Sequence, residues 1–279
     1  MYNDMSSKSN NYCLEGLKAD LLRSRSYLKQ IQKDLNCYQQ PLAPTSKQTS
    51  NLSLEIVSIH IPKTAGSAFT SILTQIYGEE HCYWDYEPSL INLDVITPKH
   101  KVIHGHLATR FVGKFPTAKI IMWIRNPIIR LVSDYYYLMS RPIEVLNQPA
   151  HKLNKEIFEN NLSLEQFAEL PGKQNVLNHY CRFGKIKLDK DYFFVGIQEF
   201  FDDDITDLSN LLHWPKIKVD KVNETTHSRY KDGLEKILSD HKLISKIVSL
   251  NQKDMELYQF GLELRAQRKG LSFKEMMDF

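Results

Sequence analysis

The sequence predicts an α/β fold: a mostly parallel β-sheet with helices on both faces and a helical extension before it. Short apolar, β-branched runs alternate with amphipathic helical segments along the chain. Several of these runs are almost continuously apolar, as expected for strands buried on both faces of a sheet. We therefore expect one α/β domain over residues 51–279, preceded by an N-terminal helix and linker over residues 1–50.

The expected elements follow one another in βα order. Four segments are predicted as strands: 54–61, 99–107, 118–127 and 191–200. Three segments are predicted as helices: 66–77, 128–140 and 202–214. Residues 141–190 are polar and predict an insertion of mixed helix and loop, either a lid or a ligand-binding segment. Residues 232–279 are charged and helical, which predicts a solvated outer layer.

The N-terminal region has a leucine repeat that predicts a helix over residues 13–37. Leucines recur every seven residues, and Ser24 interrupts the apolar seam at an inner position. They are Leu14, Leu21, Leu28 and Leu35. The helix either packs against its own domain or forms a short coiled coil that makes a homo-oligomer. The polar segment QQPLAPTSKQTSN that follows is typical of a linker.

Composition excludes several classes of protein. The formal net charge of +3 is too small to indicate a nucleic-acid partner. No apolar run approaches the ~18 residues of a membrane span, and the N-terminus lacks a secretory signal. The four cysteines form no C-x-x-C pair, which favours free thiols in a reducing compartment. We expect a cytoplasmic protein with no membrane partner and no metal site.

The segment HIPKTAGSAFTSIL, residues 60–73, predicts a phosphate-binding loop. It connects a strand to a helix N-terminus, where backbone N–H groups and the helix dipole favour an anion. Gly66 allows close approach of the backbone, Lys63 supplies a positive charge, and Thr64 and Ser67 offer hydroxyl donors. The nucleotide-triphosphate pattern G-x-x-x-x-G-K-[ST] is absent. An ordinary tight turn is the alternative.

A second anion site is predicted by WIRNPIIRLVSDYYY, residues 123–137. Arg125 ends an apolar strand, so its guanidinium is expected at the same sheet edge as the first loop. Pro127 suits the first turn of a helix, and Ser133 follows two turns later. A strand-end Arg and a helix hydroxyl are suited to bind one phosphate together.

These two segments resemble the donor-binding motifs of sulfotransferases that use 3′-phosphoadenosine 5′-phosphosulfate (PAPS). The first motif has the form P-K-T-x-[GS]-[ST] and the second R-[DN]-P-x-x-R-x-x-S-x-Y-Y. The residues that match are Pro62, Lys63, Thr64, Gly66, Ser67, Arg125, Asn126, Pro127, Arg130, Ser133, Tyr135 and Tyr136. The resemblance covers residues 54–226. It is closest to the Golgi-type heparan and uronyl 2-O-sulfotransferases, of which this chain would be a soluble, bacterial-like member.

The resemblance implies the sulfotransferase fold, which is P-loop-like, with PAPS as donor, PAP (3′-phosphoadenosine 5′-phosphate) as product and no required metal. The 5′ end of the donor would be bound by Lys63, Thr64, Ala65, Gly66, Ser67 and Ala68. Arg125 and Ser133 would hold the 3′-phosphate. The R-K-G-x-x-G ending of cytosolic small-molecule sulfotransferases is absent, which favours the glycan-type branch.

The segment VIHGHLATRF, residues 102–111, supplies the expected general base. Histidine can accept an acceptor proton near neutral pH. By resemblance to the His-Gly-His of the 2-O-sulfotransferases, His106 is the base and His104 supports it or contacts the acceptor, while Lys63 stabilises the leaving group. His60 is a rival base, and two structural histidines at a strand end are the alternative.

Two weaker fragments extend the resemblance. QNVLNHYCRFG, residues 174–184, is similar to a segment that approaches the cofactor or acceptor, with Asn175 and Asn178 as candidates. KVNETTHSRY, residues 221–230, is similar to the late loop that closes over the adenosine 3′-phosphate. Its candidate residues are Asn223, Thr225, Thr226 and Arg229.

The predicted function is transfer of a sulfuryl group from PAPS to a hydroxyl, or alternatively an amine, of a small-molecule or saccharide acceptor. Two other functions stay open. One is a kinase or NTPase with a degenerate loop, which would need a Mg²⁺-binding Asp at a strand end. The other is a non-catalytic PAP-binding protein that uses its N-terminal helix as a scaffold.

Overall fold

The computed structural model describes residues 53–86, 95–147, 152–183, 187–217 and 228–271. The chain divides into two compact units, Met1–Gln40 and Pro41–Phe279, and all described residues belong to the second. The predicted N-terminal helix and linker lie outside the described residues.

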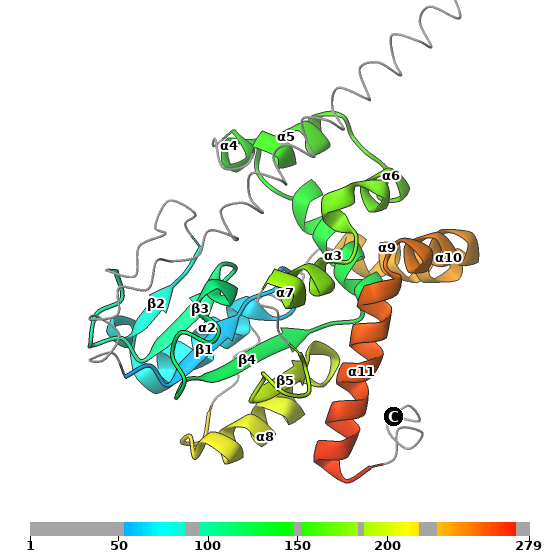
Figure 1. Ribbon diagram of the computed structural model, residues 1–279. Helices are drawn as coiled ribbons and strands as arrows, with labels where there is room; N and C mark the ends of the chain where they lie inside the picture. Colours follow the sequence, from blue (N-terminus) through cyan, green and yellow to red (C-terminus); the bar gives the residue numbers. More distant parts are fainter. Residues whose placement is uncertain (1–52, 87–94, 148–151, 184–186, 218–227, 272–279) are drawn as a thin grey trace, which may run out of the picture. The chain divides into compact units, whose positions relative to one another are not determined.

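A five-stranded parallel sheet forms the centre of this second unit (Figure 1). The strand order is β2-β3-β1-β4-β5, and every neighbouring pair is parallel. The strands are β1 (Ile56–Ile59), β2 (Cys82–Trp84), β3 (Val102–Gly105), β4 (Lys119–Ile124) and β5 (Phe194–Ile197). The α/β prediction is confirmed, and because all strands run the same way, their carboxyl ends share one edge.

Alternate residues of each strand pack into cores on opposite faces of the sheet. On one face, α2 (Gly66–Tyr77) and α8 (Phe201–Leu212) cover Ile56, Ile121 and Trp123. On the other face, the short helix η4 (Ala108–Phe111), α7 (Val176–Phe183) and α11 (Gln252–Lys269) cover Val57 and Met122. The strand segments are apolar throughout because both faces are buried.

A third cluster is built around α3, which follows β4. Its helices are α3 (Pro127–Met139), α4 (Ile143–Leu146), α5 (Lys152–Glu159), α6 (Leu164–Glu169), α9 (Ser228–Ser239) and α10 (His241–Leu250). α3 contacts α5, α6, α9 and α10, with Leu131 and Val132 fully buried between them. The predicted insertion over 141–190 therefore supplies α4, α5, α6, the short helix η6 (Pro171–Lys173) and α7.

Two expectations are corrected. The charged C-terminal region is not only a solvated layer: α11 packs on β5, and Leu262 and Ala266 are buried in the core. Its cations pair with acidic side chains of α8, as Arg265 does with Asp204, so the charges are neutralised inside the fold. In addition, β2 was not predicted, because three residues are too short to show a strand period.

Among the described helices, none is both long and apolar enough to cross a lipid bilayer.

Candidate active site

The segment between β1 and α2 has the backbone geometry of an anion-binding turn. Lys63 and Ala65 both have φ of 69°, in the left-handed region that non-glycine residues rarely adopt. Left-handed residues in such a turn direct successive backbone N–H groups toward one point. No side chain caps the N-terminus of α2, so its first amides remain available to a ligand.

Gly66 is required here for space. An added Cβ would lie 1.7 Å from Nε2 of His60, so the imidazole ring packs directly on the first residue of α2. The same ring is held by the Tyr86 hydroxyl, which lies 2.7 Å from its Nδ1. His60 therefore packs against the turn and has a structural role there.

The turn's side chains contribute unequally. The Thr64 hydroxyl is buried and donates to the carbonyl oxygen of Ile61 at 2.8 Å, so its proton closes the turn. Thr64 is therefore suited to offer a backbone amide, because its hydroxyl hydrogen is used within the turn. Ser67 is exposed in the first turn of α2, followed by the half-buried Ala68.

The Lys63 ammonium lies 3.8 Å from the centre of the Tyr137 ring on α3, a cation–π distance. Burial lowers the pKa of Lys63; the positive charges of Arg125 and Arg141 add to this, and Asp134 opposes it. The Lys63 ammonium therefore lies near other positive charges, and a bound anion would reduce their mutual repulsion.

The structure brings the two predicted anion sites together. Arg125 follows β4, and its Nη1 donates to the carbonyl oxygen of Lys63 at 3.2 Å. Its Nη2 donates to the Tyr230 hydroxyl at 3.4 Å. Its Nε is buried and has no partner among the described residues. A buried guanidinium N–H without an acceptor fits a site built for an anion.

Helix α3 begins with Asn126 as N-cap, whose side chain accepts from the amides of Ile128 and Ile129. Ser133 lies two turns into α3 and is 2% exposed. Arg130 is equally buried, pairs with Asp134 at 3.7 Å and donates to the carbonyl oxygen of Lys173. Its Nε also lacks a partner among the described side chains and backbone.

His106 directly follows β3, and its ring has the tautomer that can accept a proton. Its Nδ1 lies 2.7 Å from the carbonyl oxygen of His60. Because a carbonyl oxygen can only accept, Nδ1 carries the hydrogen and Nε2 keeps its lone pair. Burial lowers the pKa of His106, although the His60 hydrogen bond and Asp134 oppose this, so the ring is neutral near pH 7.

His104 occupies a different environment. It lies on the α2 face of β3, is 1% exposed, and its Nδ1 lies 2.8 Å from the Ser58 hydroxyl. Burial lowers its pKa to about 3. The His60 ring is stacked between the other two, with centroids 5.2 Å from His104 and 4.4 Å from His106. Of the three rings, His106 is the one that lines the cavity described next.

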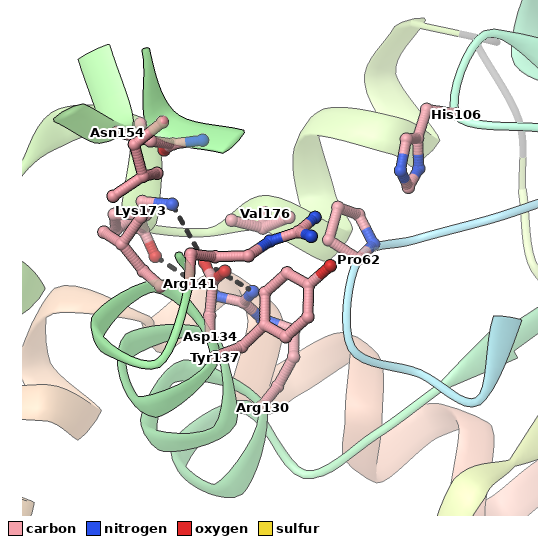
Figure 2. A pocket seen from close by; sticks show the side chains of 12 residues that line it. Pro62, His106, Arg130, Asp134, Tyr137, Arg141, Asn154, Lys173 and Val176 are labelled. Atoms are coloured by element: carbon pink, nitrogen blue, oxygen red, sulfur yellow. Dashed lines mark hydrogen bonds and ion pairs between the residues drawn. The ribbon is translucent and has the colours of Figure 1, made fainter. Parts of the chain in front are cut away.

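A cavity of about 320 Å³ joins the loop, His106 and α3 (Figure 2). One wall is Pro62 and His106; the opposite wall is a stripe on α3. The stripe consists of Arg130, Asp134 and Tyr137, and Arg141 follows two residues beyond the end of the helix. Lys173 of η6 completes the charged lining and binds Asp134 at 3.0 Å. The cavity therefore places a neutral histidine opposite three cations and one carboxylate.

Four cavity residues were not among the predicted site residues: Asp134, Tyr137, Arg141 and Lys173. Asp134 and Tyr137 had a readable signal, because they follow Arg130 by four and seven residues, the repeat of one helix face. Lys173 had none, since it reaches the site through long-range packing. Tyr230 ends the segment 221–230 that the resemblance places near the 3′-phosphate, but it was not singled out there.

Asn175 is structural, and its assignment to the ligand site is corrected. Its side-chain oxygen accepts from the amides of Lys253 and Asp254, and its nitrogen donates to the Leu250 carbonyl. The backbone N–H of Asn178 donates to Asp254 Oδ1 at 2.8 Å. Asn223, Thr225, Thr226 and the side chain of Arg229 lie outside the described residues.

The geometry defines an α/β protein with a loop suited to bind an anion, an arginine beside it whose Nε has no partner in the described part of the chain, and a cavity lined by three cations and one carboxylate. Comparison with known proteins agrees: the sequence model of the Sulfotransferase family matches residues 51–261. The chain belongs to the sulfotransferase family, and this assignment rests on that match. The search of curated protein sequences found no match.

Among solved structures, the chain is similar to a sulfotransferase from Alicyclobacillus acidocaldarius. The two share 14% sequence identity with a TM-score of 0.32. The alignment covers 71% of this chain and 95% of that structure.

Proposed function

We propose that this protein transfers a sulfuryl group from PAPS to a hydroxyl of a small-molecule or saccharide acceptor. The observation that carries the proposal is that His106 Nε2, the Lys63 turn and Arg125 converge at one sheet edge. His106 and Pro62 line the cavity, Lys63 directly follows Pro62, and Arg125 binds the Lys63 carbonyl oxygen. Family membership supports sulfuryl transfer as the reaction, and the residues described above fit the donor.

The donor would be held from its two phosphorylated ends. Backbone amides from Lys63 to Ala68 would bind the 5′-phosphate at the N-terminus of α2. Arg125 would bind the 3′-phosphate through the N–H groups that it does not use in the fold, with Ser133 on the neighbouring helix. Asn223, Thr225 and Thr226 remain proposed contacts at the same end.

His106 would take the acceptor proton on Nε2 while the acceptor oxygen forms its bond to sulfur. As the bond between sulfur and the bridging oxygen breaks, its electron pair stays on the phosphate oxygen. Lys63 and the loop amides would stabilise the charge that grows there, a type of preorganised stabilisation that often dominates catalysis. The His60 carbonyl would keep His106 in the reactive tautomer.

The cavity lining favours an acceptor that carries a negative charge. Asp134 already binds Lys173 and Arg130; although burial opposes its ionisation, these cations lower its pKa. Arg141 lies 4.4 Å from the Tyr137 ring centre and forms no ion pair with a described carboxylate. The guanidinium of Arg141 extends toward Pro62 in Figure 2. An anionic group of the acceptor would neutralise it.

The test is a screen of acceptors with PAPS labelled in its sulfuryl group. Matched pairs such as a terminal glucuronide and the corresponding glucoside, plus one amine, separate the acceptor classes. We expect label transfer with equal release of PAP, higher for the acidic member of a pair, and lost in Lys63→Ala. Tight PAP binding without transfer to any acceptor would indicate a non-catalytic binding protein. Mg²⁺-dependent ATP hydrolysis without sulfuryl transfer would indicate a kinase or NTPase.

A further inference from the structure

Tyr230 is a buried tyrosine whose hydroxyl lies beside the arginine of the second anion site. Its ring is 8% exposed at the start of α9. Nη2 of Arg125 donates to its oxygen at 3.4 Å, while Nη1 of the same guanidinium donates to Lys63. Arg125 is thus held on one side by the loop after β1 and on the other by α9.

The position of Tyr230 is fixed by packing against α3. Its ring meets that of Tyr136 edge to face, with centroids 5.7 Å apart. Further along α9, Gly233 allows a close approach of the Tyr136 hydroxyl, since a Cβ at Gly233 would lie 2.0 Å from that oxygen. Helix α9 is therefore seated on α3 so that the Tyr230 hydroxyl reaches Arg125.

A phenol has one hydrogen to donate and an oxygen that accepts. The Tyr230 oxygen accepts from Arg125, and no described residue accepts the hydrogen of its hydroxyl, so this hydrogen can be donated to another acceptor. An anion bound by Arg125 would be such an acceptor, and a hydrogen bond to a charged oxygen is stronger than one between neutral groups. The unpartnered Nε of Arg125 identifies the guanidinium as the place where such an anion would bind.

We propose that the Tyr230 hydroxyl is a further contact to the 3′-phosphate of the nucleotide, beside the Arg125 guanidinium of the proposed donor site. Tyr230 orients the guanidinium by accepting from Nη2 and donates its own hydrogen to the phosphate. The ligand is a nucleotide that carries a phosphate on the 3′ position of its ribose. This inference rests on the proposed function, and it adds a residue that selects PAPS over nucleotides without that phosphate.

The test compares PAP with adenosine 5′-monophosphate, which lacks the 3′-phosphate, by calorimetry on the full-length protein. Tyr230→Phe keeps the ring and removes only the hydroxyl. We expect PAP affinity to fall about tenfold, while affinity for the monophosphate changes less than about twofold. In turnover, the KM for PAPS should rise by a similar factor, with kcat at saturating PAPS nearly unchanged.

Two further variants make the result specific. Tyr77→Phe is the matched control, because the Tyr77 hydroxyl also accepts a long hydrogen bond, 3.3 Å from Trp214 Nε1, outside the site. It should leave the PAP-to-monophosphate ratio unchanged. Arg125→Ala should lose most of that ratio and marks the full effect of the 3′-phosphate site.

Each outcome decides a separate question. If wild-type protein binds PAP no more tightly than the monophosphate, the donor assignment and this inference both fail. If Arg125→Ala loses the preference for PAP but Tyr230→Phe keeps it, only this inference fails. Equal weakening of both nucleotides by Tyr230→Phe would mean that the hydroxyl serves the fold alone, and would also overturn it.

Discussion

Replacing Gly66 by Ala tests the anion-binding turn with the smallest available change. The added Cβ would lie 1.7 Å from His60 Nε2 and 2.1 Å from two ring carbons, where ordinary contacts are 3.4–4 Å. The His60 ring must therefore leave its place, and it is tied to the Tyr86 hydroxyl at 2.7 Å. Because the His60 carbonyl accepts from His106, movement of this segment would also displace the base.

The cost follows from overpacking in a rigid turn. Inserting one methyl group into a well-packed interior typically costs about 1–3 kcal/mol of unfolding free energy. We expect Gly66→Ala to fall in this range and to weaken PAP binding by about a hundredfold, because close approach of the backbone to the phosphate is lost as well. The second change, His60→Ala, removes the clashing ring and should restore much of the stability of the Gly66→Ala protein.

The assay is a double-mutant cycle over the two single variants and the pair, measured by urea unfolding and PAP calorimetry. We expect the two changes to be coupled by at least about 1 kcal/mol in the free energy of unfolding. The double variant should lose less stability than the sum of the losses in the two single variants. Additive losses would show that the His60 ring does not lie against Gly66. Unchanged PAP affinity in Gly66→Ala would show that the turn is not the phosphate site.

Three further predictions concern single residues. His106→Gln should lower kcat by about 10²–10⁴ with the free energy of unfolding nearly unchanged. In the wild-type protein, kcat/KM should be level near pH 7 and fall on acidification with an apparent pKa below 6.5. The reason is that burial lowers the pKa of His106 and the neutral ring is the base. An acid limb above 6.5 would assign the base elsewhere. Lys63→Ala should lower kcat by about 10²–10³, and Lys63→Arg should recover only part of it; full activity in Lys63→Ala under saturating PAPS would contradict its role. Asn175→Ala should cost about 1–3 kcal/mol in urea unfolding without changing the KM for PAPS, because its side chain binds the turn between α10 and α11; a raised KM with unchanged stability would return Asn175 to the ligand site.

The elements that carry the donor site were predictable because their signals are local. The apolar run before His60, the Gly66 turn and the Asn-Pro start of α3 are each set by neighbouring residues. The strands and helices they predict are present within one or two residues of the expected bounds. Since parallel strands end at one edge, local elements were enough to bring Arg125 beside Lys63.

Residue roles that depend on long-range packing were not predictable. The sequence predicted that the Thr64 hydroxyl donates to the anion, because nothing in it shows that this hydroxyl donates to the Ile61 carbonyl oxygen. Asn175 was predicted as a ligand contact, yet its partners lie more than seventy residues away, at the end of α10 and the start of α11. The resemblance gave the two histidines of His-Gly-His different roles, but their different surroundings depend on the end of β3, which falls between them at Gly105.

Helix α11 shows why polar composition misleads about burial. Its charged residues predicted a solvated layer, but Arg265 and Arg268 both bind Asp204 of α8. The Asp204 carboxylate also accepts from the amide of Ile197 at the end of β5. The ion pairs that allow the charged residues of α11 to be buried connect residues far apart in the chain. No periodic pattern in the sequence predicts these pairs.

The most direct test of the donor site is a crystal structure of the protein with PAP bound. The proposed function predicts the 5′-phosphate on the backbone amides of the turn from Lys63 to Ala68. It predicts the 3′-phosphate within hydrogen-bonding distance of Arg125 Nε, with His106 Nε2 facing the 5′ end across the cavity. A nucleotide bound elsewhere, or bound with its two phosphates exchanged, would contradict the account.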